Sequence, residues 1–259
     1  MAGAFQAAKF QANEWVLGRN TPLSYPARHR VCRPDSFSAH QQEYDSMDAI
    51  DSLIEGYRSF RAGTYKQNEE RYQALAAKRQ QPKALIIACC DSRADPAMVF
   101  SADPGELFVV RNVANLVPPY QPDSHYHGTS AALEFGVKGL EIADIIVMGH
   151  AGCGGIEALY EAGCGHPPEG DFISNWMSLA TGVETAIRTK HGDLEKPGLL
   201  RLMEQGAVVQ SLDMLRTFPF IAEREKAGKL RLHGWFYGIG TGILSIYDPA
   251  TERFDAVPE

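Results

Sequence analysis

The sequence predicts an α/β protein with a mainly parallel central sheet, flanking helices, an antiparallel edge strand and an N-terminal helical arm. Short apolar runs at 84–90 and 144–148 have the length and composition of buried parallel strands. Helical periodicity lies before, between and after them, and strands that alternate with helices are typical of a parallel sheet. The segments 230–237 and 242–247 flank a glycine-rich GIGTG turn, which favours an antiparallel hairpin at the end of the chain.

The remaining elements are predicted from the spacing of apolar residues. Residues 46–62 place apolar side chains at helical intervals after a serine cap, and Gly63 is expected to end this helix. A polar helix is expected over 67–79. Further along, the pattern predicts a strand at 107–111 and helices at 96–100, 129–138, 156–162, 173–190 and 199–217. Residues 1–45 lack such periodicity and are expected to form a poorly ordered extension, which leaves 46–259 as a single domain.

Length and charge limit the class of protein. The chain has 259 residues and a formal net charge of -7, which fits one α/β domain with appendages and argues against a nucleic-acid-binding surface. It contains no run of 18 apolar residues, so we expect no membrane span. Polar and charged residues interrupt the first fifteen positions, unlike a secretory signal, and the arginines of residues 1–46 resemble a transit peptide only weakly.

The five cysteines have no regular spacing and do not suggest a disulfide framework. A reducing, cytoplasmic location is therefore expected. Two of them, Cys90 and Cys164, are interpreted as small buried hydrophobic residues, which is the usual role of an isolated cysteine.

The segment ALIIACCDSR, residues 84–93, ends in a group of reactive side chains. Because alternate side chains of an extended chain share a face, Cys89, Asp91 and Arg93 are expected to point one way and Cys90 the other. Ligands of open α/β sheets bind at the carboxyl ends of the strands. A thiolate, a carboxylate and a guanidinium at that edge favour a functional site, although Asp91 and Arg93 would also suit a structural ion pair.

A second group follows the strand 144–148 in the segment GHAGCGG. If this strand is a neighbour of the first, His150 and Cys153 reach the same edge of the sheet as Cys89. Two sulfur ligands and one imidazole suit zinc, and three protein ligands leave a fourth position for water, as catalytic zinc sites do. The segment GCGG, residues 152–155, suits either a tight turn or a backbone nest for an anion.

The paired motifs C-x-D-S-R and G-H-x-x-C-G-G resemble the β-class carbonic anhydrases, in particular the plant-type branch. The segments PGELFVVRNVANLVPP and HGTSAALEFGV resemble the same family. The resemblance implies one zinc ion per chain, held by Cys89, His150 and Cys153. It also implies that Asp91 and Arg93 are a catalytic pair and that zinc-bound hydroxide hydrates carbon dioxide reversibly to bicarbonate and a proton.

The resemblance implies a substrate pocket and an assembly as well. Gln80, Phe108, Val113 and Phe135 match pocket positions of the family, and Gly154 is expected to join them. In the family the N-terminal helices pack on a partner subunit. Gln80 precedes the first strand and Cys89 ends it, so Gln80 would reach a zinc site only in a partner, which predicts a homodimer or higher homo-oligomer. The alternative is that Gln80 caps the preceding helix.

Two other functions stay open from the sequence. The chain would also suit a non-catalytic zinc protein of the same fold, or a hydrolase that acts on a molecule like carbon dioxide, such as carbon disulfide. Activity toward carbon dioxide in the zinc-loaded protein distinguishes the first, and comparing turnover of the two substrates distinguishes the second. Neither alternative involves a nucleic-acid or membrane partner.

Overall fold

A computed structural model describes residues 48–258 of the chain. The described residues form two units, 48–79 and 80–258. The expected N-terminal extension, 1–45, lies outside the described residues. The expectation that 46–259 make a single domain stays a prediction.

The first unit is helical throughout most of its length. Helix α2 (Ala49–Phe60) begins after Asp48, whose side chain accepts a hydrogen bond from the amide of Ile50 at 2.9 Å; the serine expected as its cap lies outside the described residues. Gly63 does not end the helix as expected, because the chain continues as a π-helical turn, η1 (Arg61–Tyr65). Helix α3 (Glu69–Ala76) follows, shorter than the predicted 67–79.

Helix α2 carries a stripe of large apolar side chains that is exposed among the described residues. The side chains are 63% exposed at Ile50, 71% at Leu53, 42% at Ile54 and 61% at Tyr57. These residues recur at helical intervals, so they share one side of the helix. The predicted N-terminal helical arm is therefore present, with an apolar face that nothing described in its own unit covers.

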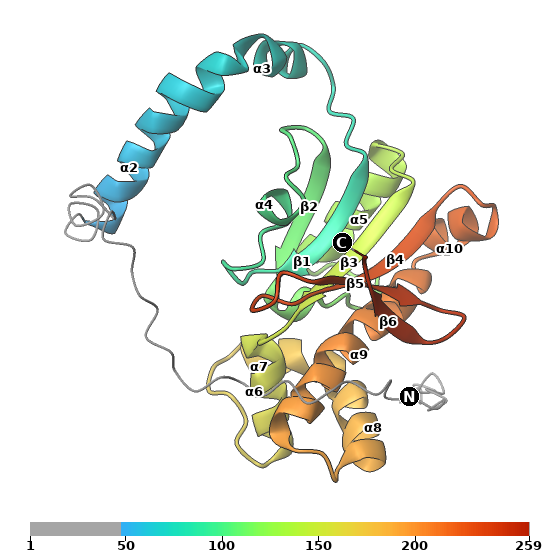
Figure 1. Ribbon diagram of the computed structural model, residues 1–259. Coiled ribbons are helices and arrows are strands. Elements are labelled where there is room, and N and C mark those ends of the chain that lie inside the picture. Colours follow the sequence, from blue (N-terminus) through green and yellow to red (C-terminus); the bar gives the residue numbers. More distant parts are fainter. Residues whose placement is uncertain (1–47, 259) are drawn as a thin grey trace. The chain divides into compact units, whose positions relative to one another are not determined.

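The second unit is built on a six-stranded sheet in the order β2-β1-β3-β4-β5-β6 (Figure 1). The strands are β1 (Ala84–Cys89), β2 (Leu107–Asn112), β3 (Asp144–His150), β4 (Arg231–Tyr237), β5 (Leu244–Asp248) and β6 (Arg253–Ala256). The first four in spatial order are parallel, and β5 and β6 are each antiparallel to their neighbours. The predicted α/β class and the antiparallel edge are confirmed. The edge strand itself, β6, was not predicted.

Helices flank this sheet. They are α4 (Pro96–Val99), α5 (Gly128–Glu134), α6 (Gly154–Gly163), α7 (Ile173–Met177), α8 (Thr181–His191), α9 (Lys196–Arg216) and α10 (Pro219–Lys226). Helix α5 continues as a π-helical turn, η3 (Phe135–Gly139), and the predicted helix 173–190 is divided by a 3₁₀ turn, η4 (Ser178–Ala180). Helix α10 was not predicted, although a proline at its first position, Pro219, is a signal of a helix start.

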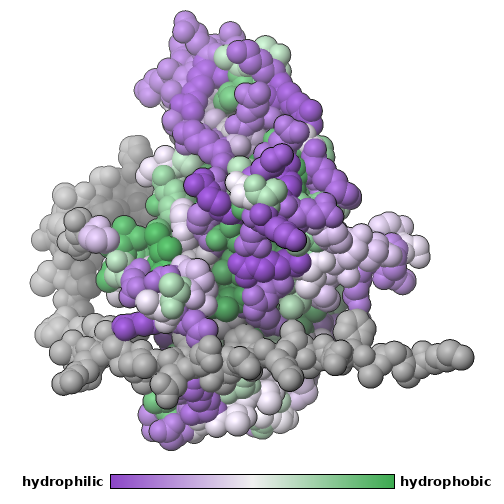
Figure 2. Space-filling view, turned by 90° about the vertical axis from the view of Figure 1, so that its right-hand side faces the viewer, coloured by the Kyte–Doolittle hydropathy of each residue, from purple (hydrophilic) through white to green (hydrophobic). Residues whose placement is uncertain are grey.

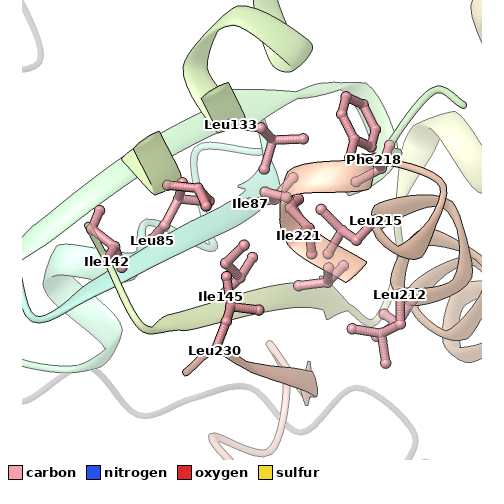
Figure 3. Packing of buried hydrophobic residues seen from close by; sticks show 14 residues of the cluster. Leu85, Ile87, Leu133, Ile142, Ile145, Leu212, Leu215, Phe218, Ile221 and Leu230 are labelled. Carbon is pink, nitrogen blue, oxygen red and sulfur yellow. The ribbon is translucent and has the colours of Figure 1, made fainter. Parts of the chain in front are cut away.

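The main hydrophobic core lies between one face of the sheet and the helices α5, α9 and α10 (Figure 3). Leu85 and Ile87 of β1 and Ile145 of β3 contribute to it from the sheet, and all three are fully buried. All six residues of β1 are buried, as expected for a central parallel strand with both faces covered. Full burial of β1 fixes its register and therefore the position of the residues that follow it.

The strand order brings the ends of β1 and β3 together. Strand β1 pairs with β3 through Ala88 and Met148, so the last residues of the two strands, Cys89 and His150, lie at the same edge. Helix α6 leaves from this edge, and α7 and α8 gather near it (Figure 1). The carboxyl end of the parallel sheet is therefore enclosed by helices rather than open to solvent on all sides.

The surface of the described part is mixed in polarity. Figure 2 shows one face of the molecule, on which hydrophilic residues are the most frequent and smaller groups of hydrophobic residues lie between them. Among residues 48–258, no helix combines the length and the apolar composition that crossing a membrane requires.

Candidate metal centre

Three side chains converge at the carboxyl end of the sheet. Cys89 is the last residue of β1, His150 is the last residue of β3, and Cys153 is the residue before α6. Their ligand atoms all lie within 4.8 Å of one another, and the two Sγ atoms are 3.9 Å apart. The three residues are 6%, 1% and 3% exposed. The prediction that β1 and β3 are neighbours in the sheet is confirmed, and so is the convergence of these three side chains.

The donor atoms fit a zinc ion. The Nε2 atom of His150 is buried and has no hydrogen-bond partner among the described residues. Its other ring nitrogen, Nδ1, lies 3.0 Å from the carbonyl oxygen of Ala151, which suits a donated N–H and leaves Nε2 with a free lone pair. A buried polar atom without a partner is costly, and a metal ion held by this imidazole and two thiolates would satisfy it.

One of the two thiols, that of Cys89, is favoured to lose its proton. A hydrogen bond from Cys153, opposed by burial, lowers the pKa of the Cys89 thiol well below its usual range. The shared proton correspondingly raises the pKa of Cys153. The amide of Ala114 also donates to the Sγ atom of Cys89, at 3.4 Å. Because thiolates and not thiols bind zinc, stabilisation of negative charge on Cys89 favours metal binding.

The amide that faces Cys89 is presented by an unusual turn. Ala114 has a φ of 62° and Asn115 a φ of 48°, both in the left-handed region that residues other than glycine seldom occupy. The indole Nε1 of Trp176 donates to the carbonyl of Val113 at 2.8 Å and holds the start of this turn. The backbone strain is therefore located next to the first candidate ligand, where it directs an N–H at the sulfur.

Asp91 is held beside the three candidate ligands by Arg93. The guanidinium donates from Nε to Oδ1 at 2.9 Å and from Nη2 to Oδ2 at 2.7 Å, and the amide of Arg93 donates to Oδ1 at 2.9 Å. Oδ2 of Asp91 lies 4.0 Å from Nε2 of His150. These hydrogen bonds from Arg93 hold the pKa of Asp91 well below its usual range, so the group is a carboxylate at neutral pH.

The prediction that Cys89, Asp91 and Arg93 lie together is confirmed, but the reason given for it was wrong. Strand β1 ends at Cys89, so alternation along an extended chain does not continue to Arg93. Instead a turn follows, in which the amide of Ala94 donates to the carbonyl of Asp91 at 3.1 Å. Asp91 and Arg93 meet because the carboxylate accepts from the backbone and the side chain two residues on, a local pattern typical of aspartate.

A residue that the sequence analysis missed holds the backbone of this segment. Arg111 of β2 donates from Nε to the carbonyl of Cys89 at 2.9 Å and from Nη2 to the carbonyl of Asp91 at 2.7 Å. Its Nη1 pairs with Asp95 at 2.7 Å. Register places Arg111 opposite Ala88, one pair before Cys89. One partly buried guanidinium therefore fixes the carbonyls of the first and last residues of the C-x-D motif.

The predicted pocket residues divide into two groups. Val113 packs in the same hydrophobic cluster as Cys89 and Cys153, and Gly154 is exposed at the first position of α6. A side-chain carbon added at Gly154 would meet no atom within 4 Å, so the space beside it is open. Val113 and Gly154 are therefore brought to the metal centre within one chain.

Phe108, Phe135 and Gln80 are not brought to it. Phe108 pairs in register with Leu85, four pairs before Cys89, which is about 13 Å along the strand. Its ring lies 6.0 Å from that of Phe135, which is 49% exposed. Gln80 is exposed and precedes the amino end of β1. Within one chain these three residues lie toward the opposite end of the sheet from the metal centre.

The two remaining described cysteines correct an expectation. Cys90 and Cys164 were predicted to be buried, but both are exposed thiols. Cys90 follows the end of β1, and Cys164 lies at the end of α6, where its Sγ atom accepts a hydrogen bond from Nη2 of Arg188 at 3.2 Å. Both residues occupy positions where a regular element has just ended, and burial inside the element does not extend to them.

The fold and this centre define a class of protein: an α/β protein with a buried Cys₂His group at the carboxyl edge of a parallel sheet and an aspartate–arginine pair beside it. The sequence model of the family described as carbonic anhydrase matches residues 84–244. Because that match covers more than half of the chain, the chain belongs to the carbonic anhydrase family.

Similar proteins place it in the β class. It is 36% identical to a carbonic anhydrase of Pseudomonas aeruginosa over 80% of this chain and 91% of that protein. It is 35% identical to beta carbonic anhydrase 3 of Arabidopsis thaliana, over 80% of this chain and 81% of that protein. The solved structure of the beta-carbonic anhydrase CcaA matches with a TM-score of 0.75 and 32% identity, over 81% of this chain and all of that chain. A tetrameric beta-carbonic anhydrase of Sordaria macrospora matches with a TM-score of 0.64 and 26% identity, over 76% of this chain and 95% of that chain.

Proposed function

We propose that the protein catalyses the zinc-dependent, reversible hydration of carbon dioxide to bicarbonate and a proton. The observation that carries the proposal is the convergence of Cys89, His150 and Cys153 within 4.8 Å, beside a carboxylate that Arg93 holds in place. Membership of the carbonic anhydrase family supports the same reaction. Three protein ligands would leave room for the reacting water on a bound zinc ion, as catalytic zinc sites do and closed structural sites do not.

Different residues of the chain would bind the metal and orient the reacting water. Cys89, His150 and Cys153 would hold the metal, and bound zinc would supply a Lewis acid that makes water a better nucleophile at neutral pH. The carboxylate of Asp91 would accept a hydrogen bond from the attacking water and so orient its lone pair toward carbon dioxide.

Arg93 would keep Asp91 in that role. Both carboxylate oxygens are occupied by the guanidinium, which leaves Asp91 ionised and restrains it from turning toward the metal position. Such a fork-to-fork pair fixes both orientation and charge. Val113 and the open space beside Gly154 would provide the apolar wall and the exit for the anion.

The test is a stopped-flow measurement of carbon dioxide hydration, with the zinc content determined on the same sample. We expect hydration well above the buffer rate in protein that carries zinc. Zinc-loaded protein without hydration activity would indicate a non-catalytic zinc protein, and faster turnover of carbon disulfide than of carbon dioxide would indicate a hydrolase instead.

We also propose that the active unit is a homo-oligomer in which a partner completes the pocket. Gln80, Phe108 and Phe135 lie toward the opposite end of the sheet from the metal centre of their own chain. A two-fold arrangement would place these residues beside the candidate metal centre of a second copy, because in such a dimer each chain presents the same surface to the other. The relative from Sordaria macrospora is tetrameric, and the exposed apolar stripe of α2 supports an interface between copies.

A further inference from the structure

A buried carboxylate from a distant helix contacts the loop between the other two candidate ligands, His150 and Cys153. Glu204 belongs to α9 and is 5% exposed. Its Oε1 atom accepts two hydrogen bonds from consecutive backbone amides, from Gly152 at 2.7 Å and from Cys153 at 3.1 Å. A charged side chain that is this deeply buried is costly unless it is hydrogen-bonded. The two amides of the loop between His150 and Cys153 therefore supply the hydrogen bonds that the buried carboxylate of Glu204 requires.

The peptide group between Gly152 and Cys153 is held at both ends. Its N–H, on Cys153, points at Glu204, and its carbonyl, on Gly152, accepts from Nη2 of Arg93 at 3.2 Å. Gly152 has a φ of 69°, a conformation that glycine adopts without strain. A rotation of this peptide would break both contacts at once. The orientation of the peptide is therefore linked to Glu204 on one side and to the Arg93–Asp91 pair on the other.

The other oxygen of Glu204 is weakly satisfied. Oε2 lies 3.6 Å from Nε of Arg201, whose side chain is 51% exposed. The carboxylate also lies near the amino end of α6, where negative charge is favourable. A purely structural role, as a cap for α6, would explain the two amide contacts but would not require any effect on the metal centre.

We infer that Glu204 is a positioning residue of the metal centre, which orients the Gly152–Cys153 peptide so that Cys153 and the Arg93–Asp91 pair take their places together. The inference rests on the proposed function, since it assumes that Cys153 is a zinc ligand. Glu204 does not touch the ligand atoms; it acts through the backbone amide of one ligand residue. Groups that orient metal ligands in this way commonly change metal affinity about 10- to 100-fold when they are removed.

Two substitutions of Glu204 distinguish the effect of its hydrogen-bond acceptor from the effect of its negative charge. Glu204→Leu removes both hydrogen bonds and is expected to weaken zinc binding about 10- to 100-fold. Glu204→Gln keeps an amide oxygen for the two N–H groups but loses the charge, so its loss of zinc affinity is expected to be smaller and still measurable, about threefold or more. Hydrogen bonds to a charged acceptor are roughly twice as strong as those to a neutral one.

Glu184 offers a matched control. It is 6% exposed, lies on the neighbouring helix α8 and pairs with Arg188 on the same helix. The hydrogen bonds of its carboxylate within the described part of the chain come from Thr185 and Arg188, not from the loop 150–154. Glu184→Leu therefore reproduces the loss of a buried carboxylate, with its general cost in stability, while the amides of Gly152 and Cys153 keep their acceptor. It should leave zinc affinity within about threefold of that of the unchanged chain, the margin set by ordinary context effects on such values.

The experiment is a competition between the full-length proteins and a chelator of known zinc affinity, with the visible absorption spectrum of the cobalt-substituted proteins as a second readout. We expect weaker zinc binding and a changed cobalt spectrum in Glu204→Leu, and neither in Glu184→Leu. Zinc affinity of Glu204→Leu within threefold of that of the unchanged protein would overturn the inference, as would an equal loss in Glu184→Leu. If Glu204→Leu does not fold, Glu204→Gln decides by the same threefold limit. An unchanged protein that binds no zinc would overturn the proposed function instead.

Discussion

Arg93 and Asp91 are joined by two parallel hydrogen bonds, from Nε to Oδ1 at 2.9 Å and from Nη2 to Oδ2 at 2.7 Å, and the same Nη2 reaches the carbonyl of Gly152. This one guanidinium therefore links the segment after β1 to the loop after β3. The aspartate is fixed relative to both halves of the metal centre before any substrate arrives. Such preorganisation is what allows a single carboxylate to orient a reacting water.

Asp91→Asn should lower the rate of carbon dioxide hydration about a hundredfold or more, the usual scale for a positioned acid–base group. The amide would replace one oxygen that faces the guanidinium by an NH₂ group, so the pair with Arg93 is lost. Zinc should be retained, because Asp91 is not among the three converging ligands. Stopped-flow hydration and zinc content are measured on the same preparation. A zinc-loaded Asp91→Asn protein with near-normal turnover would remove Asp91 from the mechanism.

Cys89→Ser should lose zinc, whereas Cys90→Ser should keep it. Cys89 is buried with its Sγ atom 3.9 Å from that of Cys153, while Cys90 is exposed. The two variants make the same chemical change at adjacent positions, so each controls for the other. Zinc content after dialysis, by elemental analysis, gives the answer. Loss of zinc from Cys90→Ser together with its retention in Cys89→Ser would show that the ligand is assigned to the wrong residue.

Gln80→Ala should impair hydration without releasing zinc, since Gln80 lies at the amino end of β1 and the candidate ligands lie at the carboxyl end. If a partner supplies Gln80, mixed dimers of Gln80→Ala and Asp91→Asn chains contain one centre with both defects and one with neither. Activity in mixed dimers should then exceed that of either parent. The measurement is hydration by purified mixed dimers that carry a different affinity tag on each chain. Activity no higher than that of the parents would exclude a shared centre.

Asp144 should make the stability of the fold depend on pH in the acid range. Hydrogen bonds from Arg231, opposed by burial and reinforced by His233, lower the pKa of Asp144 in the folded state below its unfolded value of about 3.9. The carboxylate therefore stabilises the fold above that value, and the contribution is lost as the pH falls through the folded pKa. Asp144→Asn should lose less stability than the unchanged chain as the pH is lowered below about 4.

The size of this effect is modest, because Arg231 is 71% exposed and water screens the pair. We expect a difference of about 1 kcal/mol or less in the free energy of unfolding at neutral pH. Urea unfolding over a pH series, with Asp171→Asn in an exposed loop as the control, measures it. Parallel pH curves for the unchanged protein and Asp144→Asn would contradict the assignment.

The sequence was sufficient to predict the convergence of Cys89, His150 and Cys153, because these residues lie at or just after the ends of two buried strands. Apolar runs of this length indicate parallel strands, and the carboxyl ends of parallel neighbours meet at one edge. The contacts of Arg111 could not be predicted in this way. They depend on the register between β1 and β2, which tertiary packing determines. Glu204 was equally hidden, because a glutamate on a long helix has no local pattern that indicates a distant backbone partner.

Local propensity also failed where packing or loop geometry decides. Glycine is a residue type that often ends helices, yet the chain continues through Gly63 as a π-helical turn. The edge strand β6 has only four residues, so its alternation of polar and apolar side chains is too short to be a clear strand signal, and the strand forms by pairing with β5. The cytoplasmic location expected from the cysteines stays a prediction, which fractionation of the source cells would test.

We propose that a single zinc ion held by Cys89, His150 and Cys153 makes this chain a catalyst of carbon dioxide hydration. The most direct test is to strip the protein of metal and titrate zinc back while hydration is followed by stopped flow. We predict that activity rises in proportion to added zinc and stops rising at one equivalent per chain, with no activity before the first addition. Full activity in metal-free protein, or bound zinc that restores none, would contradict the account.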